Sequence, residues 1–255
     1  DRFDKSHILS VGRPINSFYL YKTLGVFQTD DHVPGNPFTG DRLGGNGPYQ
    51  GGEFYLADLD GNSFIDIYND WVNPDKMPVG DPNPKFTGGW INNFTYKGFN
   101  LSIFSTFTFD RDVLNLYESD IFNTSSFADA NTFAQYSTPD FSKIDIWQKP
   151  GDVATYAKYD IGSWRAYYTS AQTFFLERGG YFRIKSVNMG YNFGSNSLKR
   201  SGINKLRVFG IVDNLLMIQQ SKKLPDAEAV NPYGEYNGAG YPIPKKYTIG
   251  VELNF

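Results

Sequence analysis

The sequence predicts an all-β fold in which antiparallel strands form one arc of a transmembrane β-barrel. Apolar and polar residues alternate with a period of two in several segments, which gives each strand one apolar and one polar face. Aromatic residues make up 17% of the 255 residues, although all hydrophobic residues together reach only 40%. Short turns alternate with long connections, an asymmetry typical of membrane barrels.

Five segments carry the alternation. They are residues 86–96, 99–109, 186–193, 205–218 and 246–255. The last is the clearest, with one face made of Tyr247, Ile249, Val251, Leu253 and Phe255. Phe104 interrupts the period in the second segment, and Phe209 and Ile211 interrupt it in the fourth.

The strand length suits a bilayer. Eleven residues at about 3.4 Å each, tilted by about 40°, rise roughly 28 Å, and the apolar band of outer-membrane barrels is about 25 Å tall. Aromatic rings at strand ends would then lie at the headgroup level. These are Phe86, Tyr96, Phe99, Phe109, Tyr247 and Phe255. A water-soluble β-sandwich with one buried face is the alternative fold.

The connections divide the chain into two regions. Lys97-Gly98 predicts a tight hairpin turn, whereas residues 110–180 and 219–244 form long loops. Residues 1–84 are rich in Gly, Pro and Asn without sustained alternation. We therefore predict a loop region over 1–84 and barrel strands with their loops over 85–255.

Five strands cannot close a barrel, because the smallest bacterial barrels need about eight. In a bilayer, each unpaired edge would leave backbone donors and acceptors without partners. The remaining wall is expected from another chain or from an upstream segment lost before Asp1. The first residues include neither an initiator methionine nor an apolar signal core, as expected of a processed piece.

Composition excludes several classes of protein. The chain contains no cysteine, which rules out a disulfide framework or a Cys-ligated zinc site. A net charge of −3 lacks the basic excess of a nucleic-acid binder. No apolar stretch is long enough for a transmembrane helix. His7 and His32 are interpreted as surface histidines, and no catalytic constellation is recognisable, so we expect no enzyme.

Several sequence stretches, taken in their order and spacing, carry a family resemblance. They are residues 12–22, 25–29, 58–66, 80–86, 96–102, 181–191 and 206–215, together with the terminal strand ending in Phe255. In these stretches the chain resembles the C-terminal third or quarter of the SusC/RagA family of TonB-dependent outer-membrane transporters of Bacteroidetes. The resemblance covers essentially the whole chain.

The resemblance implies a 22-strand barrel in the outer membrane, to which this chain would contribute about the last five strands. It also implies an N-terminal plug inside the barrel, a SusD-like lid lipoprotein outside it, and TonB as the energy source in the periplasm. Phe255 resembles the signal that the barrel-assembly machinery reads at the periplasmic rim. Residues 1–84, 110–180 and 219–244 would then be extracellular.

The function implied is that of a barrel component in an importer of oligosaccharides or oligopeptides. Two alternatives remain open. One is a SusC-like scaffold subunit that does not transport, and the other is a secreted glycan-binding β-sandwich.

An acidic loop predicts a structural calcium ion. Asp58, Asp60, Asn62 and Asp66 stand at positions 1, 3, 5 and 9 of the loop, and Phe64 offers its backbone carbonyl at position 7. Oxygen ligands with this spacing are what Ca²⁺ prefers. A solvated turn is the alternative interpretation, because Asp and Asn readily accept hydrogen bonds from their own backbone. No other cofactor is expected.

Aromatic residues of the long loop predict a contact surface for a ligand or for the lid. They are Trp147, Tyr156, Tyr159, Trp164, Tyr167 and Tyr168. Aromatic faces stack on sugar rings and peptide side chains, and protein interfaces are also enriched in them. Packing of these rings against one another is the alternative.

Overall fold

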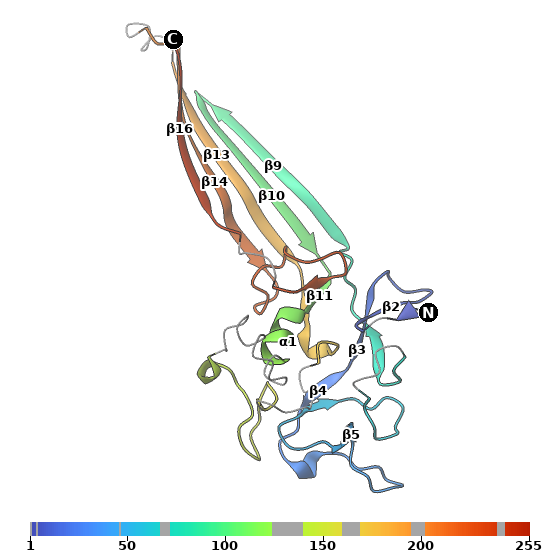
Figure 1. Ribbon diagram of the computed structural model, residues 1–255. Helices are drawn as coiled ribbons and strands as arrows, with labels where there is room; N and C mark the ends of the chain where they lie inside the picture. The colour runs from blue at the N-terminus through green and yellow to red at the C-terminus, as the bar shows by residue number, and fades with distance from the viewer. Residues whose placement is uncertain are drawn as a thin grey trace, which may run out of the picture. The chain divides into compact units, whose positions relative to one another are not determined.

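The computed structural model describes residues 2–3, 5–45, 47–66, 72–123, 140–159, 169–194, 202–238 and 243–255. The chain divides into two compact units (Figure 1). Unit 1 comprises Asp1–Asn83, Val113–Glu177 and Val230–Gly238, and unit 2 comprises Pro84–Asp112, Arg178–Ala229 and Ala239–Phe255. Unit 1 therefore combines the predicted N-terminal region with parts of both long connections.

Unit 2 is built on one antiparallel sheet of five strands in the order β9-β10-β13-β14-β16 (Figure 1). The strands are β9 (Phe86–Tyr96), β10 (Phe99–Phe109), β13 (Tyr181–Phe193), β14 (Lys205–Gln219) and β16 (Lys246–Asn254). All five predicted strands are confirmed, and β13 begins earlier than expected. Each strand pairs with its neighbour in sequence, so the sheet is a simple meander with β9 and β16 at its edges.

The register of the sheet aligns the apolar side chains of neighbouring strands. Ile103 lies opposite Val187, Val187 opposite Val212, and Val212 opposite Tyr247. One position earlier on β10, Ser102 lies opposite Asn188. The sheet thus has an apolar face and a polar face, as the alternation predicts.

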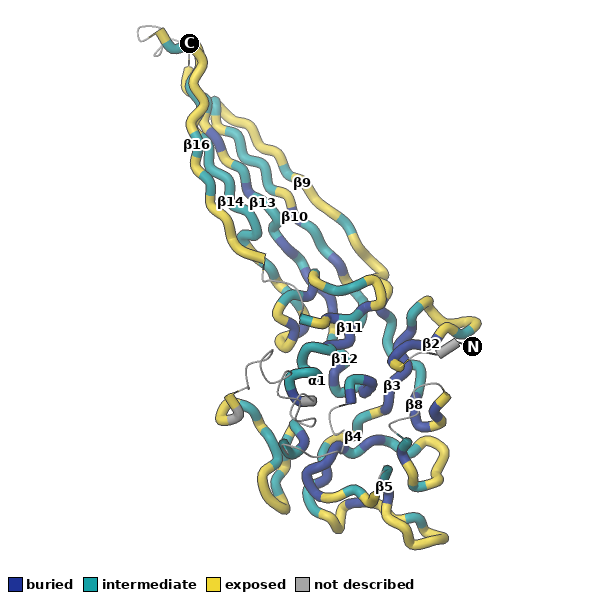
Figure 2. Tube along the Cα trace, in the orientation of Figure 1, coloured by how far each residue is buried: buried dark blue, intermediate teal, exposed yellow. Residues whose placement is uncertain are grey.

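No other described element of unit 2 covers the apolar face of its sheet. Its exposed members are Phe86, Trp90, Phe94, Tyr96, Phe99, Phe109, Met189, Tyr191, Phe193, Val208, Leu216, Ile218, Tyr247, Ile249, Val251 and Leu253. Trp90 is 60% exposed and Ile249 is 85% exposed. Figure 2 colours these strands mainly as exposed or intermediate. A continuous apolar surface of this extent is unusual for a protein in water.

The turn between β9 and β10 has the predicted form. Lys97 and Gly98 have φ angles of 44° and 85°, and two positive φ values are the signature of a type I′ hairpin. A side chain at position 98 would place its Cβ 2.6 Å from the carbonyl oxygen of Asn192. The turn therefore requires glycine for both its conformation and its packing.

Two of the residues that interrupt the alternation, Phe104 and Phe209, lie on the polar face, where their rings cover glycines on the next strand. Phe209 lies opposite Gly250, and a Cβ on Gly250 would be 2.3 Å from the Phe209 ring. Phe104 covers Gly89 in the same way, with a ring atom 3.3 Å from the position of a Cβ. The ring fills the space that the missing side chain leaves, so the apolar residue is tolerated on this face.

Unit 1 holds short strands. A four-stranded sheet has the order β1 (Arg2–Phe3), β2 (His7–Leu9), β3 (Ser17–Tyr21), β8 (Lys76–Val79). Two pairs are β4 (Thr23–Val26) with β7 (Phe54–Leu56), and β5 (Gly44–Gly45) with β6 (Gly47–Pro48). A three-stranded sheet has the order β12 (Leu176–Arg178), β11 (Asp112–Asn115), β15 (Glu235–Tyr236).

The helical segments are short. They are α1 (Leu116–Asn123) and three 3₁₀ turns, η1 (Asp30–His32), η2 (Phe141–Lys143) and η3 (Thr173–Phe175). Asn115 caps α1, since its Oδ1 accepts the Glu118 N–H and its Nδ2 donates to the Glu118 carboxylate. Among the described residues, no helix combines the length and apolar composition needed to cross a membrane.

The hydrophobic core of unit 1 explains why its strands show no alternation. All five residues of β3 are buried, and Phe18, Leu20 and Tyr21 have no exposed surface. A strand buried on both faces reads as a continuous apolar run. Around β3 the core gathers residues from distant segments, including Phe54, Leu114 and Phe175. A loop-rich sequence thus forms a packed unit.

Candidate functional site

A buried ion-pair network fixes a loop against the polar face of unit 2. Arg183 on β13 is 4% exposed, and its Nη2 donates to both Asp226 carboxylate oxygens at 2.6 Å. Its Nε lies 2.7 Å from Glu228 Oε2, while the Nζ of Lys185 lies 2.6 Å from Glu228 Oε1. Arg111 adds a hydrogen bond from its guanidinium to the carbonyl of Ala227. Three cations therefore hold residues 226–228 in place.

The acidic loop of unit 1 brings three carboxylates together. Oxygens of Asp58, Asp60 and Asp75 lie within 4.8 Å of one another. Two of these residues belong to the predicted calcium loop, but the third comes from the segment before β8. Asp66 is not in this group. Its backbone carbonyl instead accepts a hydrogen bond from the Tyr21 hydroxyl at 2.6 Å.

The loop also forms the turn that was the alternative interpretation. Asp58 accepts the backbone N–H groups of Gly61 at 2.7 Å and Ser63 at 2.8 Å. Asn62 Oδ1 accepts the N–H of Phe64 at 2.6 Å. These bonds orient the loop without an ion. The carboxylate donors are of the hard type that Ca²⁺ prefers, so the calcium ion remains a prediction, with Asp75 in place of Asp66.

Burial gives Asp75 an unusual titration. Asp75 is 1% exposed, and its burial raises its pKa to about 6. The charges of Asp60 and Asp58 also raise this pKa, whereas the hydrogen bond from the Leu59 N–H lowers it. Between pH 4 and 6, Asp75 is therefore mostly protonated in the folded protein and mostly ionised in the unfolded chain. This group favours folding at low pH, and its contribution falls as the pH rises through that range.

We expect Asp60→Asn to raise the thermal stability of the full-length protein at pH 7.5 without divalent cations. The substitution removes a like charge beside Asp75, so less repulsion opposes folding once Asp75 is ionised. It should also flatten the loss of stability between pH 4 and 6.5. Calcium should stabilise the wild type at pH 7.5 but stabilise Asp60→Asn less. Calorimetric scans across pH, with and without CaCl₂, measure both effects.

The control for this prediction is Asp41→Asn, because Asp41 is exposed in another loop of unit 1. Its scans should match those of the wild type. An identical calcium response in the wild type and Asp60→Asn would contradict an ion at this cluster.

The described aromatic residues of the long loop are packed into unit 1. Trp147 lies against Gly52, where a Cβ would be 2.4 Å from the ring, and its indole N–H donates to the Gln28 carbonyl at 3.1 Å. Tyr156 donates to Glu118 Oε1 at 2.6 Å, and burial together with this carboxylate raises its pKa. Tyr159 is half-buried against the same core.

These three rings pack against other residues of unit 1, and a contact with a ligand or lid stays a prediction. Trp164, Tyr167 and Tyr168 lie outside the described residues. Phe255 follows β16 and is 77% exposed, and its role as an assembly signal also stays a prediction.

The prediction of two surface histidines is wrong for one of them. His32 is exposed, whereas His7 is 7% exposed because it lies on β2 beside Phe18 and the segment around Tyr233. The sequence contains no local signal for this contact, since His7 and Tyr233 are 226 positions apart. The sequence did not predict Asp75 as part of the acidic cluster for a similar reason, because Asp75 lies farther from Asp58 and Asp60 along the chain than a loop motif extends.

Comparison with known proteins relates the whole chain to one group. It is 26% identical over 259 residues to TonB-dependent receptor P3 of Formosa agariphila, covering 98% of this chain and 23% of that protein. TonB-dependent receptor P39 of the same organism is 24% identical over 284 residues, covering 98% of the chain and 26% of that protein. Both of these similar proteins are named TonB-dependent receptors. No family model matches the sequence.

Solved structures agree with this relationship at the level of the fold. A structure of the RagAB peptide transporter superimposes with a TM-score of 0.64 at 19% identity, over 98% of this chain and 24% of that chain. The RagAB peptide importer in its open-open state gives a TM-score of 0.61 at 18% identity, over 98% and 23%. The chain spans about a quarter of the length of the proteins it matches.

The similarity to TonB-dependent receptors bears on three predictions. The resemblance stated from the sequence holds, because the relatives are named TonB-dependent receptors, and the expectations of an outer-membrane location and of a chain that is not an enzyme agree with those names. The structure is mostly antiparallel β-sheet with few helices, as predicted for the all-β class.

Proposed function

We propose that this chain forms part of the barrel wall and external loops of a SusC-like, TonB-dependent importer of oligosaccharides or oligopeptides. The observation that carries the proposal is the uncovered apolar face of unit 2. Burying that face in lipid removes its large aromatic and aliphatic side chains from water, at roughly 25 cal/mol per Å². The opposite, polar face would line the lumen.

The two sheet edges support a larger barrel. Within the described residues, β9 and β16 each pair with a single strand, and unpaired backbone groups are costly inside a bilayer. The proposed barrel has 22 strands with a plug inside it. The rest of the wall and the plug would correspond to the three quarters of the related proteins' length that this chain does not cover.

The proposed partners follow from this assignment. A SusD-like surface lipoprotein would dock on the loops that unit 1 contains, and TonB would act through the plug. The barrel-assembly machinery would recognise the strand that ends at Phe255. The lipid bilayer itself would contact the apolar face.

The two alternative functions make different demands on the apolar face of unit 2. A secreted β-sandwich needs a second layer over the apolar face, and the described residues of unit 2 provide none. A scaffold subunit without transport would keep the barrel and the partners, so only a transport measurement separates it from an importer.

The test is uptake by cells that carry or lack the full-length gene. Labelled oligopeptides and labelled oligosaccharides are offered separately, in strains with and without TonB. We expect the gene to support TonB-dependent uptake of one of the two classes. Unchanged uptake of both classes on deletion, when the parent strain does carry the protein in its outer membrane, would support the scaffold and overturn the importer.

A further inference from the structure

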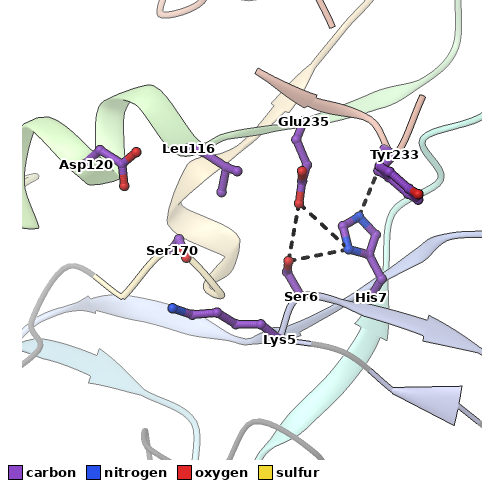
Figure 3. A pocket seen from close by; sticks show the side chains of 8 residues that line it. All are labelled: Lys5, Ser6, His7, Leu116, Asp120, Ser170, Tyr233 and Glu235. Atoms are coloured by element: carbon purple, nitrogen blue, oxygen red, sulfur yellow. Dashed lines mark hydrogen bonds and ion pairs between the residues drawn. The ribbon is translucent and has the colours of Figure 1, made fainter. Parts of the chain in front are cut away.

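A cavity of about 400 Å³ lies within unit 1 beside β2 (Figure 3). Residues from four separate stretches of the chain line it. They are Lys5, Ser6, His7, Leu116, Asp120, Ser170, Tyr233 and Glu235. With a neutral imidazole its ionisable groups sum to one negative charge, from Asp120 and Glu235 against Lys5. The lining therefore favours a cationic occupant.

Three side chains converge at one wall of this cavity. Ser6 Oγ lies 3.4 Å from His7 Nδ1 and 3.5 Å from Glu235 Oε1, while His7 Nδ1 and Glu235 Oε1 are 3.8 Å apart. Ser6 and His7 are each 7% exposed. A buried triangle of this kind invites comparison with a catalytic triad and with a metal site.

The hydrogen bonds exclude the catalytic triad. A triad places the hydroxyl and the carboxylate on opposite nitrogens of the imidazole. Here both face Nδ1, and Nε2 lies 3.0 Å from the backbone carbonyl of Tyr233. A carbonyl only accepts, so Nε2 carries the proton. The Ser6 hydroxyl therefore shares Nδ1 with the carboxylate and donates to Glu235 Oε1, which is not the arrangement of a triad.

The same hydrogen bonds match the surroundings of a metal ligand. A metal-bound histidine usually donates its other N–H to a carbonyl or carboxylate, which leaves the coordinating nitrogen unprotonated. The Tyr233 carbonyl has that role for His7. On the other side, Asn231 Nδ2 donates to Glu235 Oε2 at 3.0 Å, which turns Oε1 toward His7.

The size of the triangle fits a first-row divalent ion. From its three edges, a point in the plane of the three atoms lies about 2.1 Å from each of them, which is the bond length of zinc to nitrogen and oxygen. His7 and Glu235 would supply the strong ligands and Ser6 a weaker one. Water in the cavity would complete the coordination.

The scaffold holds these groups in place. His7 packs against the Phe18 ring with centroids 5.2 Å apart. The turn before Glu235 depends on Gly234, whose φ is +82° and whose Cβ would meet Pro82 at 2.3 Å. Asn231 accepts the N–H groups of Tyr233 and Glu235 at 2.9 and 3.0 Å. A preorganised site of this kind needs little rearrangement to bind an ion.

We propose that Ser6, His7 and Glu235 form a binding site for a borderline divalent cation such as Zn²⁺, separate from the acidic loop. The ion would tie β2 to the segment that contains Glu235, 228 residues later in the chain. The mixed nitrogen and oxygen donors suit Zn²⁺ better than Ca²⁺, whereas the all-carboxylate cluster around Asp75 has the opposite preference.

The test is calorimetric titration of ZnCl₂ into the full-length protein, purified in detergent and stripped of metal with a chelator. We expect His7→Gln to lose one zinc equivalent or to weaken that equivalent at least tenfold. Glu235→Gln should weaken it as well. His32→Gln is the matched control and should titrate like the wild type. Excess CaCl₂ should leave the His7-dependent equivalent in place.

Two further measurements keep the result clear if a variant folds poorly. Cobalt substitution in the wild type should give a visible absorption band that Zn²⁺ displaces and His32→Gln retains. A zinc-edge anomalous map of the wild type should place a peak between His7 and Glu235. Equal zinc uptake by folded wild type and His7→Gln, or no peak at this position, overturns the proposal. Neither outcome bears on the importer, which the uptake assay tests separately.

Discussion

Arg183→Met is expected to lower the free energy of unfolding by about 3–5 kcal/mol, the usual effect of removing one partner from a buried ion pair. Asp226 and Glu228 would keep their charges on the polar face of unit 2, and Asp226 would lose the ion pair that it makes with Arg183, while Lys185 and Arg111 would remain beside Glu228. Residues 226–228 should then separate from β13. Hydrogen exchange of the full-length protein in detergent should show lost protection in that loop, and thermal unfolding should shift down.

Arg178→Met is the matched control for this change. Arg178 also contacts two carboxylates, Asp112 at 3.3 Å and Asp110 at 4.0 Å, but its side chain is 68% exposed. Exposed pairs contribute about 0–1 kcal/mol, so this variant should stay close to the wild type. Similar losses in the two variants would contradict the view that Arg183 matters because it is buried.

Ile103→Arg is expected to disfavour insertion by about 2–4 kcal/mol, the cost of an arginine on the lipid face near the middle of a barrel strand. Ile103 stands at the centre of β10, in the apolar row that continues through Val187 and Val212. A guanidinium there would lose its hydration to hydrocarbon. Cell fractionation and the heat-modifiable band of the folded barrel on gels should both show a smaller folded fraction in the outer membrane.

Ser102→Arg tests the same strand from its other face. Ser102 is the preceding residue and lies opposite Asn188 on the polar face, so an arginine there would reach into a water-filled lumen. We expect near wild-type amounts of folded protein. Equal tolerance of arginine at both positions would mean that the apolar face does not meet lipid, and the barrel proposal would fail.

The sequence was sufficient for the strands of unit 2. The features that predict them are local: a period of two, the Lys97-Gly98 turn and the polar links. Side chains alternate along any strand, so the pairing of the strands preserves the apolar and polar faces that the period predicts. The interruptions at Phe104 and Phe209 could not be placed in this way. Their positions depend on Gly89 and Gly250 on neighbouring strands, and a pattern within one strand carries no information about the next.

Local sequence patterns were thus enough to predict the all-β class, the two faces of the sheet and the resemblance to TonB-dependent receptors. Which charged groups meet became visible in the folded chain: Asp75 with Asp58 and Asp60, Glu235 with His7, and Arg183 with Asp226. The physical reason is that strand alternation is set by neighbouring residues in the chain, whereas these clusters form where folding brings distant segments together. A long loop can close over many lengths at little extra entropic cost, so no spacing in the sequence marks them.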